Sequence, residues 1–149
     1  MPQIESEYIK TGKVKYVVLD FPLEAIHRNA FKAAEAARCA GEQGKFWEMH
    51  ARLFANQQAL APTNLPQHAQ ALGLDVPKFQ ECLDSGKYAT EIRKDLAEGQ
   101  KAGVTGTPGF FLGMTNPNDS KVKALRVLKG AQPYASFKEA IDSLLSSQK

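Results

Sequence analysis

The stretch Gly103-Val104-Thr105-Gly106-Thr107-Pro108-Gly109-Phe110-Phe111-Leu112-Gly113 decides how the rest of this chain is interpreted. Its glycines surround a Thr-Pro step, and an apolar run follows that step directly. Proline has no N–H to donate, so Pro108 belongs at the start or the edge of a strand. Closely spaced glycines let the backbone turn sharply or approach a bound partner. Taken alone, the stretch predicts a loop that leads into a strand at 110–112.

The composition is that of one soluble globular domain. The 149 residues are 43% hydrophobic and 23% charged, which is enough for a single core. The net charge of +3 comes from scattered residues without a run of Lys or Arg, so we expect no nucleic-acid partner. No apolar stretch approaches the roughly 18 residues of a membrane span. The first residues show no signal peptide, which leaves the compartment open.

The hydrophobic pattern predicts a helix, a strand, a block of about five helices, two strands and a last helix, in one α/β domain spanning 1–149. Val14 to Phe21 is β-branched and aromatic, so we predict a buried strand that ends at Pro22. Asn29 is the expected N-cap of the first helix in the block. The predicted elements are a helix at 2–11, helices at 30–43, 46–54, 65–72, 77–85 and 87–102, a loop at 115–119, a strand at 125–128 and a helix at 137–145.

Four segments carry a resemblance to a known family. They are Asp20-Phe21-Pro22-Leu23, the run from Ala40 to Trp47, the run from Gly103 to Phe111, and Lys129-Gly130-Ala131-Gln132-Pro133-Tyr134. Their order and spacing resemble the DsbA-type thiol:disulfide oxidoreductases over essentially the whole chain. The resemblance implies an α/β, thioredoxin-like fold with a helical insertion at about 29–102.

The resemblance also implies a substrate-binding loop. Pro108 would be the family's cis-proline and Thr107 the residue before it, with Gly106 and Val104 in the same loop. In that family the loop lies against a redox-active C-x-x-C and presents backbone groups to an extended peptide. The implied partners are proteins or peptides with cysteines, and the implied compartment is periplasmic or otherwise extracytoplasmic.

One departure from the family matters for activity. The family's C-x-x-C stands at the start of its first helix, after the central strand, and this chain begins inside that helix. We therefore expect a truncated member that lacks the first strand and the start of the first helix. Without the dithiol we expect no thiol–disulfide exchange by this chain. The missing strand would leave unpaired sheet edges, which favours a homo-oligomer or strand exchange.

The remaining chemistry-bearing residues have two interpretations each. Cys39 and Cys82 could be buried free thiols, or the structural disulfide that some DsbA-type relatives carry. His27, His50 and His68 have no metal-ligand spacing, so the sequence predicts neither a metal nor a cofactor. The pairs Phe46-Trp47 and Phe110-Phe111 could line a groove, but their spacing favours core positions.

Two other functions stay open from the sequence. The first is a binding module that keeps the loop around Pro108 for extended peptides and does no chemistry. The second is a glutathione-dependent transferase or isomerase of the same fold group. Those enzymes commonly use a serine or cysteine at the start of the first helix, which this chain also lacks.

Overall fold

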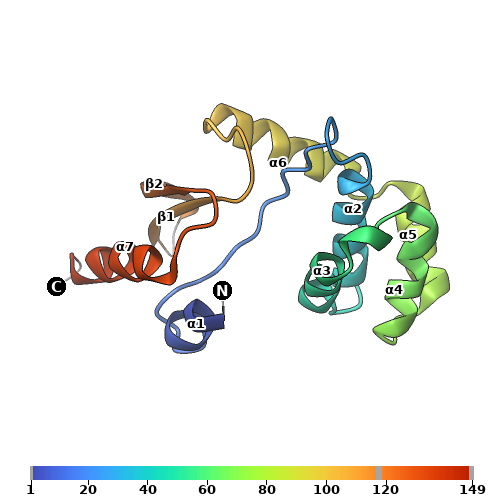
Figure 1. Ribbon diagram of the computed structural model, residues 1–149, viewed down its shortest axis with the longest axis horizontal. Coiled ribbons are helices and arrows are strands. Elements are labelled where there is room, and N and C mark those ends of the chain that lie inside the picture. The colour runs from blue at the N-terminus through green and yellow to red at the C-terminus, as the bar shows by residue number, and fades with distance from the viewer. Residues whose placement is uncertain (1, 117–118, 148–149) are drawn as a thin grey trace. The chain divides into compact units, whose positions relative to one another are not determined.

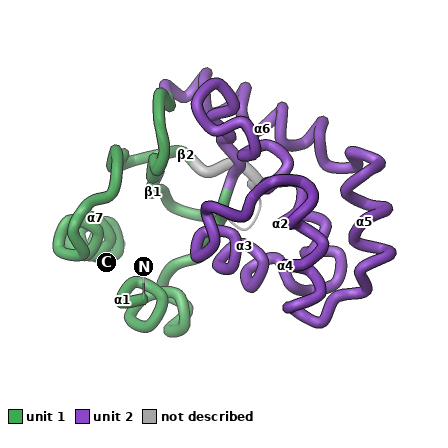
Figure 2. The backbone as a smooth tube through the Cα atoms, turned by 45° about the vertical axis from the view of Figure 1, so that its right-hand side comes forward, with its two compact units in different colours: residues 1–18, 104–149 green, residues 19–103 purple. Residues whose placement is uncertain are grey.

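The computed structural model describes residues 2–116 and 119–147. It contains two compact units (Figure 2). The hairpin unit consists of residues 1–18 and 104–149, and the helical unit consists of residues 19–103. The helical unit includes the predicted insertion at about 29–102. That residues 1–149 form a single domain stays a prediction.

The hairpin unit is built around two antiparallel strands and the last helix (Figure 1). The strands pair from Gly109↔Lys129 to Asn116↔Asp119. Phe110 packs edge-on against Phe137 of α7, with 4.8 Å between the ring centroids, so one face of the hairpin is covered. Its elements are α1 (Pro2–Ile4), a π-helical turn (Glu5–Ile9), β1 (Gly109–Asn116), β2 (Asp119–Lys129) and α7 (Tyr134–Ser146).

The helical unit packs around α2, which contacts α3, α4, α5 and α6. Alanines allow this close approach, since Ala36 and Ala40 of α2 are fully buried. Asp75 accepts a hydrogen bond from the Lys78 N–H and caps α5, and Gly86, with a φ of 63°, ends that helix. The helices are α2 (Ala30–Gly41), α3 (Phe46–Ala55), α4 (Leu65–Ala71), α5 (Val76–Ser85) and α6 (Ala89–Lys101), with short 3₁₀ turns at Gln57–Ala59 and Pro62–Asn64.

The predicted strand from Val14 to Phe21 is wrong. These residues have no regular secondary structure, and Val17 and Leu19 are 61% and 63% exposed. A β-branched sequence forms a strand only when a neighbouring strand completes the ladder. In the described part of the chain the sheet contains β1 and β2 alone, so this segment has no ladder to join.

The predicted helices are confirmed, with ends shifted by one to a few residues. Asn29 occupies the predicted N-cap position of α2, but its side chain makes no capping hydrogen bond. The predicted loop at 115–119 is too long. Thr115 and Asn116 belong to β1 and Asp119 to β2, while positions 117 and 118 lie outside the described residues.

Candidate functional site

The loop from Val104 to Pro108 joins the end of α6 to β1. Gly103, with a φ of 79°, turns the chain out of the helix. Val104 is half-buried, whereas residues 105–109 are exposed. The peptide bond between Thr107 and Pro108 is cis in the structure. The Gly130 N–H donates to the Pro108 carbonyl at 2.8 Å, which fastens the end of the loop to the end of β2.

Two glycines of this loop differ in their surroundings. A Cβ added at Gly106 would meet no atom within 4 Å, so its side of the loop is open. A Cβ added at Gly109 would lie 3.9 Å from the Gly106 carbonyl oxygen and from Val104 Cγ1, which is ordinary van der Waals contact. A bound segment could therefore reach the backbone of the loop beside Gly106. At Gly109 the same space is bordered by atoms of the loop itself.

The strand that follows the loop has one unpaired edge. β1 pairs with β2 along one side, and no other strand joins this sheet in the described ranges. Phe110 is half-buried against α7, but Phe111 is 44% exposed. The prediction of a core position is thus wrong for Phe111, because alternate residues of a strand point to opposite faces and α7 covers one face only. An exposed loop and strand edge can accept an added strand.

The two cysteines of the chain are bonded to each other. Cys39 of α2 and Cys82 of α5 form a disulfide with 5.8 Å between their Cα atoms. Their exposed fractions are 1% and 8%, so the bond lies in the core of the helical unit. The sequence contains no third cysteine. The chain in this state has no thiol that could attack a substrate disulfide.

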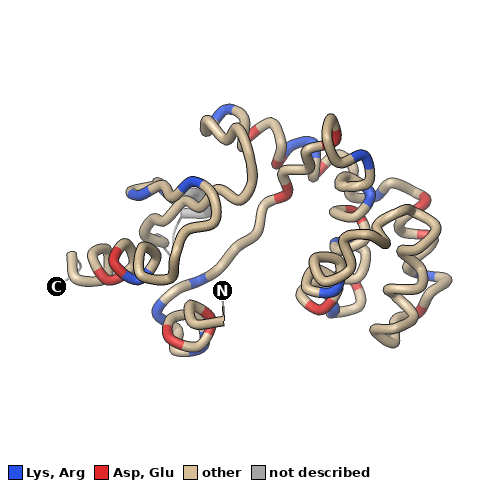
Figure 3. Tube along the Cα trace, viewed as in Figure 1, with Lys and Arg blue, Asp and Glu red and all other residues tan. Residues whose placement is uncertain are grey.

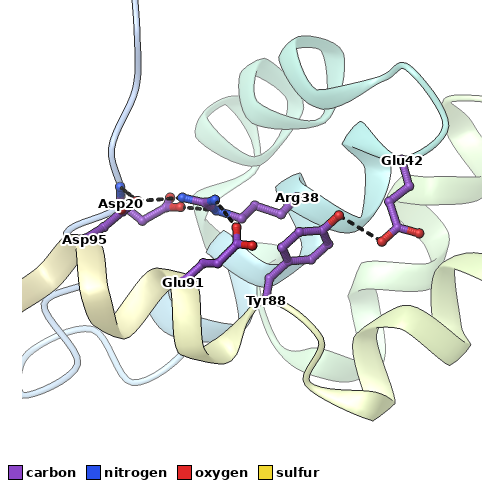
Figure 4. A network of polar contacts seen from close by, with 6 residues as sticks. All are labelled: Asp20, Arg38, Glu42, Tyr88, Glu91 and Asp95. Carbon is purple, nitrogen blue, oxygen red and sulfur yellow. Dashed lines mark hydrogen bonds and ion pairs between the residues drawn. The ribbon is translucent and has the colours of Figure 1, made fainter. Parts of the chain in front are cut away.

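A charged network at the start of the helical unit was missed by sequence reasoning (Figure 4). Arg38 Nε donates to Asp20 Oδ2 at 2.7 Å, and Nη2 donates to Asp95 Oδ2 at 2.5 Å. The Asp20 N–H also donates to Asp95 Oδ2, and Glu91 accepts from Arg38 Nη1. Burial, with a further contribution from the Asp95 charge, raises the pKa of Asp20, and Arg38 opposes this shift. The members are too far apart in sequence for any local pattern to reveal them.

A second polar cluster lies near the disulfide. Glu42 accepts a hydrogen bond from the Tyr88 hydroxyl at 2.8 Å and pairs with Lys87 Nζ at 2.6 Å (Figure 4 draws the tyrosine contact). The hydrogen bond from Lys87, followed by that from Tyr88, lowers the pKa of Glu42. Cys82 Sγ lies 3.7 Å from the same carboxylate. This cluster links the end of α2 to the turn before α6.

The aromatic face of α3 is more exposed than predicted. The His50 ring packs between Phe54, in a tilted contact, and Trp47, in an edge-on contact, with centroid distances of 4.8 and 5.8 Å. Burial lowers the pKa of His50. Phe46 packs on the core, but Trp47 is 49% exposed, so the core prediction is wrong for Trp47. Only one side of α3 contacts α2 and α4, which leaves the Trp47 side uncovered within the helical unit.

The other two histidines have structural positions. His68 is buried, accepts from Arg52 Nε at Nδ1, and places Nε2 2.9 Å from the Ala59 carbonyl. The His27 carbonyl accepts from the Ala30 N–H at the start of α2. Among the described residues no three His, Cys, Asp or Glu side chains gather as metal ligands. Basic and acidic residues are mixed along both units (Figure 3).

Sequence comparison finds relatives that are much longer than this chain. The Na⁺/H⁺ antiporter NhaA 3 of Salinispora tropica is 40% identical over 111 residues, which is 74% of this chain and 17% of the antiporter. The antiporter NhaA 1 of Salinispora arenicola is 42% identical over 99 residues, or 66% of this chain and 15% of the antiporter. The chain thus spans about a sixth of these relatives. No helix in the described ranges is long and apolar enough to cross a bilayer.

The fold has a close match among solved structures. The crystal structure of α-DsbA1 from Wolbachia pipientis superposes with a TM-score of 0.80 at 25% identity, over 98% of this chain and 75% of that one. A variant of it with two cysteines changed to alanine gives the same TM-score at 24% identity, which supports the fold alone. These matches confirm the predicted thioredoxin-like fold. The sequence profile described as Thioredoxin matches residues 1–143, and the chain therefore belongs to the thioredoxin family, as a DsbA-type member of it.

Proposed function

We propose that this chain is the substrate-recognition part of a DsbA-type thiol:disulfide oxidoreductase and does not catalyse the exchange by itself. The loop around Thr107 and Pro108, with Gly106 and Val104, would bind an extended segment of a cysteine-containing protein. The redox-active dithiol would come from another polypeptide segment. A protein with a core disulfide suits an oxidising compartment, so we also propose an extracytoplasmic location.

The observation that carries this proposal is the exposed loop that opens directly onto an unpaired strand edge. Residues 105–109 are exposed, and β1 has β2 on one side only in the described part of the sheet. An extended peptide that lies along this edge would gain main-chain hydrogen bonds from β1. Because backbone groups carry no sequence information, such binding would tolerate many substrate sequences.

The absence of catalysis follows from the cysteine chemistry. Exchange requires a thiolate that attacks a disulfide sulfur. Cys39 and Cys82 are bonded to each other and are at most 8% exposed. A buried disulfide far from a helix N-terminus is neither a ready oxidant nor a source of thiolate.

An insulin-reduction assay tests the catalytic half of the proposal. We expect the chain to leave the rate of insulin precipitation by dithiothreitol unchanged. The matched control is a Cys39→Ala/Cys82→Ala variant, which should give the same rate. Turnover by the wild-type chain that disappears in this variant would contradict the proposal, because it would make the core cysteines catalytic.

A second candidate function is that of an accessory module of a membrane transporter. The antiporter relatives favour it, since about a sixth of their length matches this chain. Deleting the matching region from the Salinispora tropica antiporter tests the idea in membrane vesicles. A change in Na⁺/H⁺ exchange would support a module that acts on transport, and unchanged exchange would contradict it.

A further inference from the structure

The disulfide between Cys39 and Cys82 is more accessible at one end than at the other. Cys39 is 1% exposed, whereas Cys82 is 8% exposed. Both belong to the core cluster of the helical unit. Thiol–disulfide exchange begins when a thiolate reaches one sulfur of the bond, and access helps to decide which sulfur is attacked. A small thiol in solution therefore meets the Cys82 end first.

A charged pair lies at this end of the disulfide, within the same unit. Glu42, which directly follows α2, places Oε1 3.7 Å from Cys82 Sγ. The same oxygen accepts a hydrogen bond from the Tyr88 hydroxyl (Figure 4) and lies 2.6 Å from Lys87 Nζ. The hydrogen bonds from Lys87 and Tyr88 hold the pKa of Glu42 below its ordinary value. Glu42 is therefore a carboxylate at neutral pH, with its charge directed at the sulfur that a thiol would attack.

We infer that the Cys39–Cys82 bond is a redox-sensitive cross-link that is reduced through Cys82, and that Glu42 protects it against negatively charged thiols. An attacking sulfur must come close to the Glu42 carboxylate, because that carboxylate is in contact with Cys82 Sγ. The Debye length is about 8 Å at 0.15 M salt, so charges this close are weakly screened. Lys87 offsets part of the repulsion. The inference does not depend on the proposed function of the loop around Pro108.

Reduction of the bond consists of two displacements by a small thiol. In the first, a thiolate attacks Cys82 Sγ, the bond to Cys39 breaks, and Cys39 Sγ leaves as a thiolate that takes up a proton from water. In the second, another thiolate attacks the sulfur of the bound reductant, and Cys82 Sγ leaves and is protonated in turn. Two small thiols are thereby oxidised to one disulfide while the protein disulfide is reduced to two thiols. Both steps bring negative charge next to Glu42, so this carboxylate should slow both.

Reduction of the folded chain by two small thiols of opposite charge tests this inference. Cysteamine carries an ammonium group and 2-mercaptoethanesulfonate carries a sulfonate. Intact mass after acid quenching and alkylation gives each rate, which is divided by the thiolate concentration. We expect Glu42→Gln to lower the ratio of the cysteamine rate to the sulfonate rate about threefold or more, and Lys87→Gln to raise it. In 1 M salt, where the Debye length is about 3 Å, both changes should shrink.

Glu98→Gln is the matched control for the loss of one carboxylate. Glu98 also pairs with a lysine, Lys94, but it lies ten residues beyond Tyr88 along α6, or about 15 Å of helix. This variant should leave the rate ratio unchanged. Equal ratios for the wild type and Glu42→Gln, or a ratio lowered by Lys87→Gln, would overturn the inference. If reduction required unfolding of the helical unit, every variant would give the same ratio, and this result would overturn it too.

Discussion

Arg38 Nε donates a hydrogen bond to Asp20 Oδ2 at 2.7 Å, and this contact ties the start of the helical unit to α2. The same guanidinium also binds Asp95 of α6 at 2.5 Å. The three side chains are 14% to 20% exposed, so solvent screens them weakly. A planar guanidinium can serve several carboxylates at once, which an ammonium group cannot do with the same geometry.

Replacing Arg38 with Met should destabilise the protein strongly. Asp20 and Asp95 would be left close together and largely buried without a counter-charge, a change that costs about 3 kcal/mol or more. Arg38→Lys should restore only part of this loss. The free energy of unfolding from urea titration measures both effects. Lys78→Met is the control, because its pair with Asp75 is exposed and should matter by less than about 0.5 kcal/mol. Equal losses for Arg38→Met and Lys78→Met would contradict the role of the network.

The Cys39–Cys82 bond should stabilise the helical unit. The two residues are 43 apart in sequence, and closing a loop of this size removes unfolded-state entropy equivalent to about 4 kcal/mol. We expect the free energy of unfolding of the Cys39→Ala/Cys82→Ala variant, measured by urea titration, to be lower than that of the wild type by about 4 kcal/mol. Intact mass after alkylation of the unfolded wild-type protein without reductant is the control. It should show no label, and two labels would contradict the bridge.

The free energy of unfolding should fall as the pH is lowered, because His50 is partly buried in its neutral form. Burial holds the pKa of His50 below its ordinary value of 6.5 in the folded state, so the unfolded state binds the proton first as the pH falls. The stabilisation from neutral His50 is thus present above pH 6.5 and is lost as the pH falls from there through the lowered pKa. His50→Phe keeps a ring beside Phe54 and Trp47 and should remove this pH dependence. Melting temperatures of both proteins across that window measure it, and parallel curves would contradict the assignment.

The helices could be predicted from sequence because their signals are local. Periodic apolar residues indicate α4 and α5, and the glycines at 73 and 86 mark where these helices end. Both signals lie within the helix or within two residues of its end. The strand expected from Val14 to Phe21 failed because a ladder depends on a neighbouring strand, which local sequence cannot supply. The sequence predicted a buried strand here, whereas Val17 and Leu19 are exposed.

The candidate site was only partly predictable. The motif around Thr107 and Pro108 indicated a loop before a strand through its glycines and proline, and the family resemblance supplied its expected role. The network of Arg38, Asp20 and Asp95 could not be predicted, because contacts across 18 and 57 residues leave no periodic signal. The exposure of Trp47 and Phe111 also escaped prediction, since it depends on which face of each element finds a packing partner.

The central claim is that the loop around Thr107 and Pro108 binds extended peptides, and a binding measurement tests it most directly. The probe is a short unstructured peptide with one cysteine, titrated into the isotope-labelled chain. We expect amide shifts confined to residues 104–112. Gly106→Ala should weaken binding roughly fivefold, equivalent to about 1 kcal/mol, because its methyl group would enter the open side of the loop. Gly109→Ala, whose methyl group faces the loop itself, should bind as the wild type does. Shifts elsewhere in the chain, or equal affinities for Gly106→Ala and wild type, would contradict the claim.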